Sequence, residues 1–298
     1  MFDLSQLAGR LSCPDDGRLL RFNEYHFACD DCGRQFPVLR SRMLELLPSA
    51  PTNLGSQANA NWRRSYEQTF HRLLSPRDPA LPWGAPEVQP EVWLRKRRRQ
   101  VTAILPLLSC GQDTSDLLLC DVSAGAGLYT LSYAAHFRGV LHCDLDPGSL
   151  AYALKAAERQ GFNNVVFLRI DYLCPPFRKV LDRVLCLDSL IRGPAHERSL
   201  LRSLCGMLAS GGRAVVDFHN WWHNPARRLG LLPQNFIGGS SYTRRAANRM
   251  LASLGIPATH YFGFVQEIEA GDDRYKRLGR SFLPATRLVY TLAPPLGG

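Results

Sequence analysis

The sequence predicts an α/β protein whose main part is a doubly wound, mostly parallel sheet, preceded by a small β-rich unit. Two observations predict this. First, short apolar runs alternate with helical patterns through residues 117–298, and strands separated by helices are typical of a parallel sheet covered on both faces. Second, residues 1–48 hold closely spaced short apolar runs and a cluster of cysteines, which is typical of a small module that is stabilised by a metal ion or by disulfides.

Composition bounds the class of protein. Of the 298 residues, 45% are hydrophobic and 21% are charged, which excludes wholesale disorder. No apolar run approaches the roughly 20 residues of a membrane-spanning helix, and the first residues lack the pattern of a signal peptide. Six of the nine cysteines lie beyond residue 100, mostly inside apolar runs, as reduced thiols do. We therefore expect a cytoplasmic protein without a membrane span.

Five apolar runs predict the parallel strands, at residues 117–120, 140–143, 164–170, 183–187 and 213–218. Between the second and third, apolar residues within 150–157 recur at i, i+3, i+4 and i+7, which predicts a helix. Asp146 supplies its N-cap, Pro147 its first turn and Gly161 its end. A further helix opens at Thr243 and is followed by two closing strands, at 260–268 and 286–292.

Small residues and carboxylates follow three consecutive strands. The first strand runs into a loop of small residues, 121–127, which lets the backbone approach a ligand closely. Asp144 ends the second strand and Asp171 follows the third. Such acids at the carboxyl edge of a parallel sheet are placed to bind ribose hydroxyls and an adenine amino group. Singly, the loop is compatible with a tight turn and each acid with a helix cap, but together they indicate a nucleoside pocket.

Residues 95–292 resemble the class I S-adenosylmethionine-dependent methyltransferases, in particular the ubiquinone-biosynthesis type. The family's first motif is an acid followed by three alternating glycines, and the chain matches it from Asp121 to Gly127 with Ser123 in place of the first glycine. A serine suits that position where its φ is negative. The turn at 208–213 matches the one before the family's fifth strand. The resemblance implies a seven-stranded Rossmann-like sheet that binds S-adenosylmethionine through Asp121, Ser123, Ala124, Gly125, Gly127, Asp144, Leu145, Asp171, Tyr172 and Asp188.

Two further strand ends carry candidate catalytic groups. Asp188 follows the fourth strand and faces the methyl-transfer region that the resemblance implies. His219 follows the fifth strand and is a candidate general base, because histidine changes its charge near neutral pH. Asp188 is equally compatible with a helix cap, and His219 with a side chain that covers the core. Trp221 and Trp222 are expected to line an apolar acceptor cavity, beside a lid or a solvated loop at 220–241.

The cysteine cluster lies near the start of the chain. Cys13-x-x-Asp16 and Cys29-x-x-Cys32 have the spacing of two knuckles that direct four ligands at one zinc ion, with a carboxylate in place of one sulfur. Between and after them, short apolar runs predict three strands, at 19–22, 25–28 and 36–39. Residues 11–48 resemble the zinc ribbon of the tRNA-methyltransferase-activator family. We expect a structural zinc on these four residues, and the alternative is a ribbon that has lost its metal.

These features divide the chain into a zinc-ribbon-like domain at 1–48, a linker or acceptor-covering segment at 49–94 and a methyltransferase domain at 95–298. Aromatic residues of the middle segment are expected to cover the cofactor and shape the acceptor pocket, namely Trp62, Tyr66, Phe70, Trp83 and Trp93. We therefore predict an S-adenosylmethionine-dependent methyltransferase that acts on a small-molecule acceptor by direct in-line transfer.

Two alternatives stay open. The formal charge of +10 and the basic run at 95–99 are compatible with an RNA acceptor. That run, however, lies on an expected amphipathic helix at 93–108, where such a run is usually a solvated face, and the ribbon is not basic. The other alternative is a non-catalytic, S-adenosylmethionine-binding scaffold that activates a partner.

Overall fold

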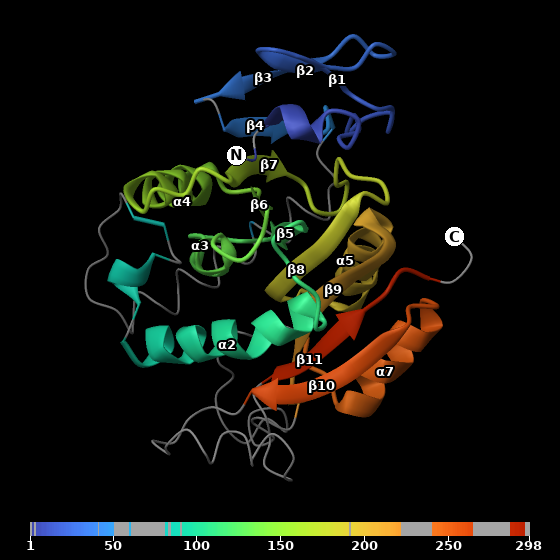
Figure 1. The fold of residues 1–298 in the computed structure, drawn as a ribbon. Coiled ribbons are helices and arrows are strands. Elements are labelled where there is room, and N and C mark those ends of the chain that lie inside the picture. The colour runs from blue at the N-terminus through green and yellow to red at the C-terminus, as the bar shows by residue number, and fades with distance from the viewer. Residues whose placement is uncertain are drawn as a thin grey trace.

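The computed structural model of the protein describes residues 2, 4–40, 42–50, 60, 81–82, 85–89, 91–190, 192–221, 240–264 and 287–295. Within these residues, strands pair into one 11-stranded sheet in the order β1-β2-β3-β4-β7-β6-β5-β8-β9-β11-β10. Figure 1 shows this sheet passing through the molecule, with the first strands of the chain at one edge and β10 near the other.

Parallel strands make the centre of the sheet, namely β5 (Leu118–Val122), β6 (Gly139–Asp144), β7 (Val165–Ile170), β8 (Leu181–Leu190) and β9 (Leu208–His219). Beyond β9 the sheet continues with two antiparallel strands, β11 (Arg287–Leu292) and β10 (Ala258–Phe264). The predicted Rossmann-like, mostly parallel sheet is therefore confirmed. Most residues of the central strands are buried, because helices cover both faces.

Helices pack on both faces of the sheet, each group through its own apolar core. One face carries α2 (Glu91–Ser109), α3 (Leu128–Tyr133) and α4 (Pro147–Arg159). The other face carries α5 (Pro194–Met207) and α7 (Arg244–Ser253). In Figure 1 the two groups lie to the left and to the right of the central strands.

The helix ends follow the signals in the sequence. Asp146 accepts a hydrogen bond from the backbone amide of Ser149 at the start of α4, at 2.8 Å. After the end of α4, Gly161 has a φ of +73°. At the start of α7, Thr243 accepts from the amide of Ala246, at 3.2 Å. These caps fix where the chain leaves each helix and returns to the sheet.

The first strands form a small antiparallel unit, made of β1 (Arg21–Asn23), β2 (His26–Ala28) and β3 (Gln35–Leu39). The predicted hairpin is present, with its turn at 24–25 instead of 23–24. A fourth strand, β4 (Met43–Leu46), was not expected from the sequence. It pairs antiparallel with β3 and parallel with β7, with a register that places Leu46 beside Ile170.

This unit and the parallel sheet share one apolar core, to which the first part of the chain contributes Leu4, Leu7, Leu11, Phe27 and Leu44. Polar contacts also cross the junction. Arg169 of β7 donates to Glu45 of β4 at 3.2 Å, and Arg42 donates to the carbonyl of Phe162 at 2.6 Å. The boundary expected at residue 48 falls just after β4, and the one expected at residue 94 falls inside α2.

Some expectations concern residues outside the described part of the chain. They are the aromatic positions 62, 66, 70 and 83, Trp222, most of the segment 220–241 and the end of the closing strand at 265–268. In the ranges that the structure does describe, no helix has the length and hydrophobicity needed to cross a bilayer.

Candidate active site

The loop between β5 and α3 turns through left-handed steps at alternate residues. The φ angles are +59° at Ser123, +57° at Gly125 and +82° at Gly127. The condition under which serine would suit this position, a negative φ, is therefore not met, because the chain reverses from strand to helix within a few residues. A β-carbon on Gly127 would come within 3.0 Å of the Ala153 β-carbon, so only glycine fits there. The motif's alternating glycines thus correspond to this alternating backbone.

Asp121 lies beneath the loop. The residue is 2% exposed, and its Oδ2 accepts from the Thr130 hydroxyl at 2.7 Å. The same Thr130 oxygen is 2.8 Å from Nδ1 of His142. Burial raises the pKa of Asp121 to about 7 and lowers the pKa of His142 to about 3. These contacts hold the start of α3 under the loop, and a direct contact of Asp121 with a cofactor stays a prediction.

Asp144, at the end of β6, faces the loop from the neighbouring strand. Its Oδ2 accepts from the amide of Gly125 and its Oδ1 from the amide of Asp146, both at 2.8 Å. Desolvation raises the pKa of Asp144, and the two amides act in the opposite direction. Beside it, the carbonyl of Leu145 accepts from Arg169 at 3.2 Å. Each carboxylate oxygen keeps a second lone pair, so Asp144 can still accept from two hydroxyls.

Asp171 and Tyr172 follow β7 at the same edge. Asp171 is 4% exposed, and its Oδ1 accepts from the amide of Leu173 at 2.9 Å. The buried Tyr172 hydroxyl accepts from Arg192 at 2.6 Å and lies 3.0 Å from Nε2 of His196. Because β5, β6 and β7 are neighbours in the sheet, the structure brings the loop, Asp144 and Asp171 to one edge, as the sequence predicted.

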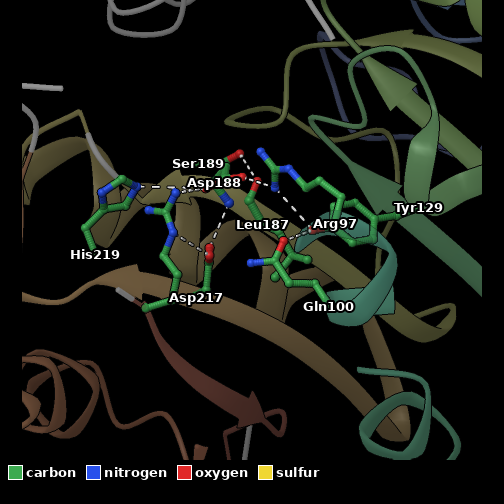
Figure 2. A network of polar contacts seen from close by, with 9 residues as sticks. Arg97, Gln100, Tyr129, Leu187, Asp188, Ser189, Asp217 and His219 are labelled. Carbon is green, nitrogen blue, oxygen red and sulfur yellow. Dashed lines mark hydrogen bonds and ion pairs between the residues drawn. The ribbon is translucent and has the colours of Figure 1, made fainter. Parts of the chain in front are cut away.

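A network of charged side chains lies where β8 ends (Figure 2). Asp188 has a left-handed backbone, with φ +58°, and its amide donates to Oδ1 of Asp217 at 2.7 Å. Its carboxylate pairs with Arg97 of α2 and with Arg287 of β11. Arg97 also donates to the Tyr129 hydroxyl at 3.2 Å. The network therefore joins α2, α3, β8, β9 and β11.

Burial governs the ionisation of this network. Asp217 is 3% exposed, and burial raises its pKa to about 6; the charge of Arg287 lowers it and that of Asp188 raises it. At Arg97, burial lowers the pKa most strongly, but Asp188 and Tyr129 together raise it by more, so the net shift is upward. The two ion pairs hold the Asp188 carboxylate between Arg97 and Arg287. The role of Asp188 as a base stays a prediction.

His219 ends β9 beside this network. Its side chain is 13% exposed, and its Nε2 lies 3.9 Å from Oδ1 of Asp188. In the antiparallel register, His219 is the direct cross-strand partner of Arg287. Two residues on, the amide of Trp221 donates to the carbonyl of Tyr242 at 3.0 Å. His219 thus lies among buried charges at the carboxyl ends of the strands, and its role as a base stays a prediction.

The basic run on α2 is divided between two environments. Arg98 is exposed and pairs with Glu91 at 3.5 Å on the outer side of the helix. Arg97 instead turns inward to Asp188. The run is therefore not one continuous solvated face, which corrects the expectation for 95–99.

The four residues predicted to bind zinc come together in the ribbon. Their ligand atoms all lie within 4.8 Å of one another. The sulfurs of Cys13 and Cys32 are 3.6 Å apart, and that of Cys29 is 3.2 Å from Oδ2 of Asp16. Zinc–sulfur bonds of about 2.3 Å would place tetrahedral ligands about 3.8 Å apart. The donor set and its spacing fit a zinc ion.

The two halves of this cluster have the same turn. The amide of Gly17 donates to the carbonyl of Cys13 at 2.9 Å, and that of Gly33 to the carbonyl of Cys29 at 3.0 Å. The φ angles of the two glycines are +74° and +73°. Asp16 thus occupies the position in the first turn that Cys32 occupies in the second. Without a metal, burial raises the pKa of the Cys13 thiol to about 12, so the thiolate needs a cation beside it.

Sequence reasoning missed three groups in the site. Arg97 was assigned to a solvent-facing run, and Arg287 was not singled out because a lone arginine at the start of a strand carries no pattern. Thr130 stands in a short helix without a recognisable spacing to Asp121. The antiparallel pairing of the closing strands, which brings the start of β11 beside the end of β9, is what places Arg287 in the site.

Comparison with known proteins agrees with this geometry. Residues 119–212 match a family described as a methyltransferase domain. One curated relative is a tRNA/tmRNA (uracil-C(5))-methyltransferase of Campylobacter curvus (strain 525.92), 38% identical over 60 residues. That match covers 20% of this chain and 16% of the relative, so it spans only a small part of either protein.

Solved structures share the fold at low identity. Magnesium protoporphyrin IX methyltransferase of Synechocystis PCC 6803 has a TM-score of 0.52 at 16% identity, covering 80% of this chain and 96% of that chain. Geranyl diphosphate C-methyltransferase of Streptomyces coelicolor A3(2) has a TM-score of 0.52 at 16% identity, covering 81% and 97%. A chain in the complex of the Haloferax volcanii Trm112 methyltransferase activator with a methyltransferase has a TM-score of 0.51 at 14% identity, covering 70% and 94%.

Proposed function

The chain contains a class I S-adenosylmethionine-dependent methyltransferase domain, and from that premise we propose that it methylates a small-molecule acceptor by direct in-line displacement. One observation carries the choice of acceptor. The groups at the end of β9 and the start of β11, where methyl transfer is expected, are largely buried, with side-chain exposures of 13% at His219 and 12% at Arg287. A site this enclosed suits an acceptor that enters a pocket.

The residues at the strand ends suit S-adenosylmethionine. The loop from Ser123 to Gly127 would hold its methionine part, since the backbone there is close to the edge and free of large side chains. Asp144 would accept from the ribose hydroxyls, and Asp171 with Tyr172 would border the adenine. When bound, the cofactor supplies a methyl group on a positively charged sulfur. The protein contributes mainly by holding the acceptor in line with that methyl group, which is worth several kcal/mol of the barrier.

We also propose one structural zinc in the ribbon, bound by Cys13, Asp16, Cys29 and Cys32. Elemental analysis of untagged full-length protein should find about one zinc per chain, and its absence after zinc supplementation would refute the site. Asp16→Cys should raise zinc affinity in competition with a chelator, because thiolate is the softer ligand. Asp30→Cys, at an exposed position of the same ribbon, should leave that affinity unchanged.

RNA is a second candidate acceptor, favoured by a basic face on α5 and α7. Its arginines are Arg198 and Arg202 on α5 and Arg244, Arg245 and Arg249 on α7, and Arg198 donates to the Ser253 hydroxyl of α7 at 2.6 Å. Across the described ranges, no ion pair neutralises any of them. Three of them line a shallow hollow of about 630 Å³ on α7. A clustered, acid-free arginine surface is typical of a polyanion-binding face.

One experiment distinguishes the candidates. Purified protein and methyl-labelled S-adenosylmethionine are incubated with total RNA, and separately with a low-mass metabolite extract, at low and moderate salt. Label in the low-mass fraction that is lost in His219→Ala would support the proposal. Salt-sensitive label in RNA that is lost when Arg245 and Arg249 are neutralised would overturn it, because phosphate contacts weaken steeply with salt. No label in either fraction, while calorimetry still shows S-adenosylhomocysteine binding, would favour the non-catalytic scaffold.

A further inference from the structure

Two buried nitrogen atoms, at the end of β9 and the start of β11, have no hydrogen-bond partner among the residues that the structure describes. They are Nε2 of His219 and Nη1 of Arg287. The two residues are direct cross-strand partners, so their side chains start from neighbouring points on one rigid sheet. Leaving a buried polar atom unpaired costs about 1–3 kcal/mol, and such atoms in folded proteins call for an explanation.

The other nitrogens of Arg287 are already engaged, which fixes the direction of the free one. Nη2 donates to Oδ1 of Asp188, and Nε lies 3.5 Å from Oδ2 of Asp217. A planar guanidinium held on two sides cannot rotate to satisfy its third nitrogen. Nη1 is therefore a fixed donor that needs an oxygen from outside the described residues.

His219, beside this donor, can accept a proton. A neutral imidazole that carries its hydrogen on Nδ1 has a lone pair on Nε2 and accepts a proton there. Asp188 lies 3.9 Å from that nitrogen and would stabilise the imidazolium that results. The other charged groups around this point are Asp217, Arg287 and, across Asp188, Arg97. A fixed donor thus lies beside a proton acceptor.

We infer that these two nitrogens form the acceptor subsite, that the methylated atom is the oxygen of a hydroxyl group, and that Arg287 is a further catalytic residue. The inference rests on the proposed function. The hydroxyl proton passes to Nε2 of His219. The oxygen electron pair forms the bond to the methyl carbon while the bond between that carbon and sulfur breaks, and its electrons stay on sulfur as a neutral thioether. Nη1 of Arg287 donates to the oxygen as its negative charge develops, and His219 later releases its proton to water.

The donor is what selects oxygen over nitrogen. A neutral amine has a single lone pair, which it needs for the methyl carbon and cannot also offer to Nη1, and a protonated amine turns a positive charge toward the guanidinium. A hydroxyl oxygen accepts from Nη1 and gives its proton to Nε2 at the same time. Fixed donors aimed at a developing oxyanion are among the strongest catalytic devices, and removal of one costs roughly 100-fold to 1,000-fold in turnover.

The test is the chemistry of the product. Full-length protein is incubated with a low-mass metabolite extract and S-adenosylmethionine carrying a ¹³C-labelled methyl group, and the carbon spectrum of the labelled fraction is recorded. The inference expects the signal of a methyl carbon bonded to oxygen. A methyl carbon bonded to nitrogen, carbon or sulfur would overturn it and leave the proposed function standing. Absence of label from the low-mass fraction would overturn the proposed function itself.

Arg287→Lys tests the residue, because lysine keeps a cation beside Asp188 but has no second nitrogen to donate. We expect labelling to fall about 100-fold, with S-adenosylhomocysteine affinity within twofold of the native protein. The same exchange at Arg213, which is exposed near the start of β9, is the matched control and should leave labelling unchanged. An oxygen-methylated product formed at the native rate by Arg287→Lys would remove Arg287 from the mechanism.

Discussion

Replacing Asp188 by asparagine takes one negative charge from between two guanidinium groups and preserves the shape of the side chain. Asparagine also tolerates the left-handed backbone of this position, at φ +58°, so the exchange adds no backbone strain. Arg97 and Arg287 then face each other across a neutral amide. The variant therefore removes the charge and one of the two acceptor oxygens without changing the shape of the side chain.

The expected loss follows from how far the network is shielded from water. The side chains are 27% exposed at Asp188, 29% at Arg97 and 12% at Arg287. Removal of one partner from a buried pair costs about 3–5 kcal/mol of the free energy of unfolding. Residual exposure and the remaining charge of Asp217, 3.5 Å from Arg287, reduce the effect. We expect a loss near the lower end, about 3 kcal/mol.

The assay is urea-induced unfolding of the full-length protein at low and high salt. Asp30→Asn is the matched control, because Asp30 pairs with Arg21 at 3.1 Å with side chains 69% and 61% exposed. That exchange should cost less than about 1 kcal/mol and lose its effect in high salt. The loss at Asp188 should persist in high salt. Equal losses for the two variants would refute the reasoning, since burial would then make no difference.

Three further predictions concern the same edge of the sheet. Asp144→Ala should weaken S-adenosylhomocysteine binding by about 1–3 kcal/mol in calorimetry, because ribose hydroxyls would lose their acceptor; an unchanged affinity would contradict the assigned role. Burial raises the pKa of Asp217 from 3.8 to about 6, so the folded protein keeps a proton that the unfolded chain releases. The free energy of unfolding should therefore fall as pH rises from about 4 to about 6. Asp217→Asn should flatten that fall in unfolding curves measured across this range, and an unaltered slope would rule the carboxyl out. Ser123→Gly should raise the free energy of unfolding by about 0.5–1 kcal/mol in thermal melts, because glycine adopts φ +59° without strain; a destabilised variant would show that the hydroxyl is needed.

Most of the correct predictions came from sequence patterns that span only a few neighbouring residues. The strand ends that hold Asp144 and Asp171 could be located from apolar runs alone, since each run is short and is followed by a loop residue. The cap at Asp146 and the knuckles around Cys13 and Cys29 depend on residues within a few positions of each other. In each case the physical cause lies within one turn or one strand, so the sequence displays it directly.

Contacts between residues that lie far apart in the sequence could not be predicted in the same way. Arg97, Asp188 and Arg287 come from three separate parts of the chain, and nothing in the spacing of single charges indicates that they meet. The pairing of β4 with β7 joins residues near 45 and 169, and β4 has only four residues. The left-handed backbone of Ser123 could not be predicted from the residue type either, because the reversal of the loop decides it.

The pairing of β4 with β7 has a consequence for synthesis of the chain. β4 leaves the ribosome well before its partner, because Met43 pairs with Phe167. Until then its backbone hydrogen-bonding groups are open along one side, as at any exposed strand edge. The apolar residues of the first segment stay exposed until β7 is synthesised, because they share one core with β7. During that interval, a metal held by Cys13, Asp16, Cys29 and Cys32 would be the one cross-link available within the nascent ribbon, and we expect early metal capture to reduce its aggregation on the ribosome.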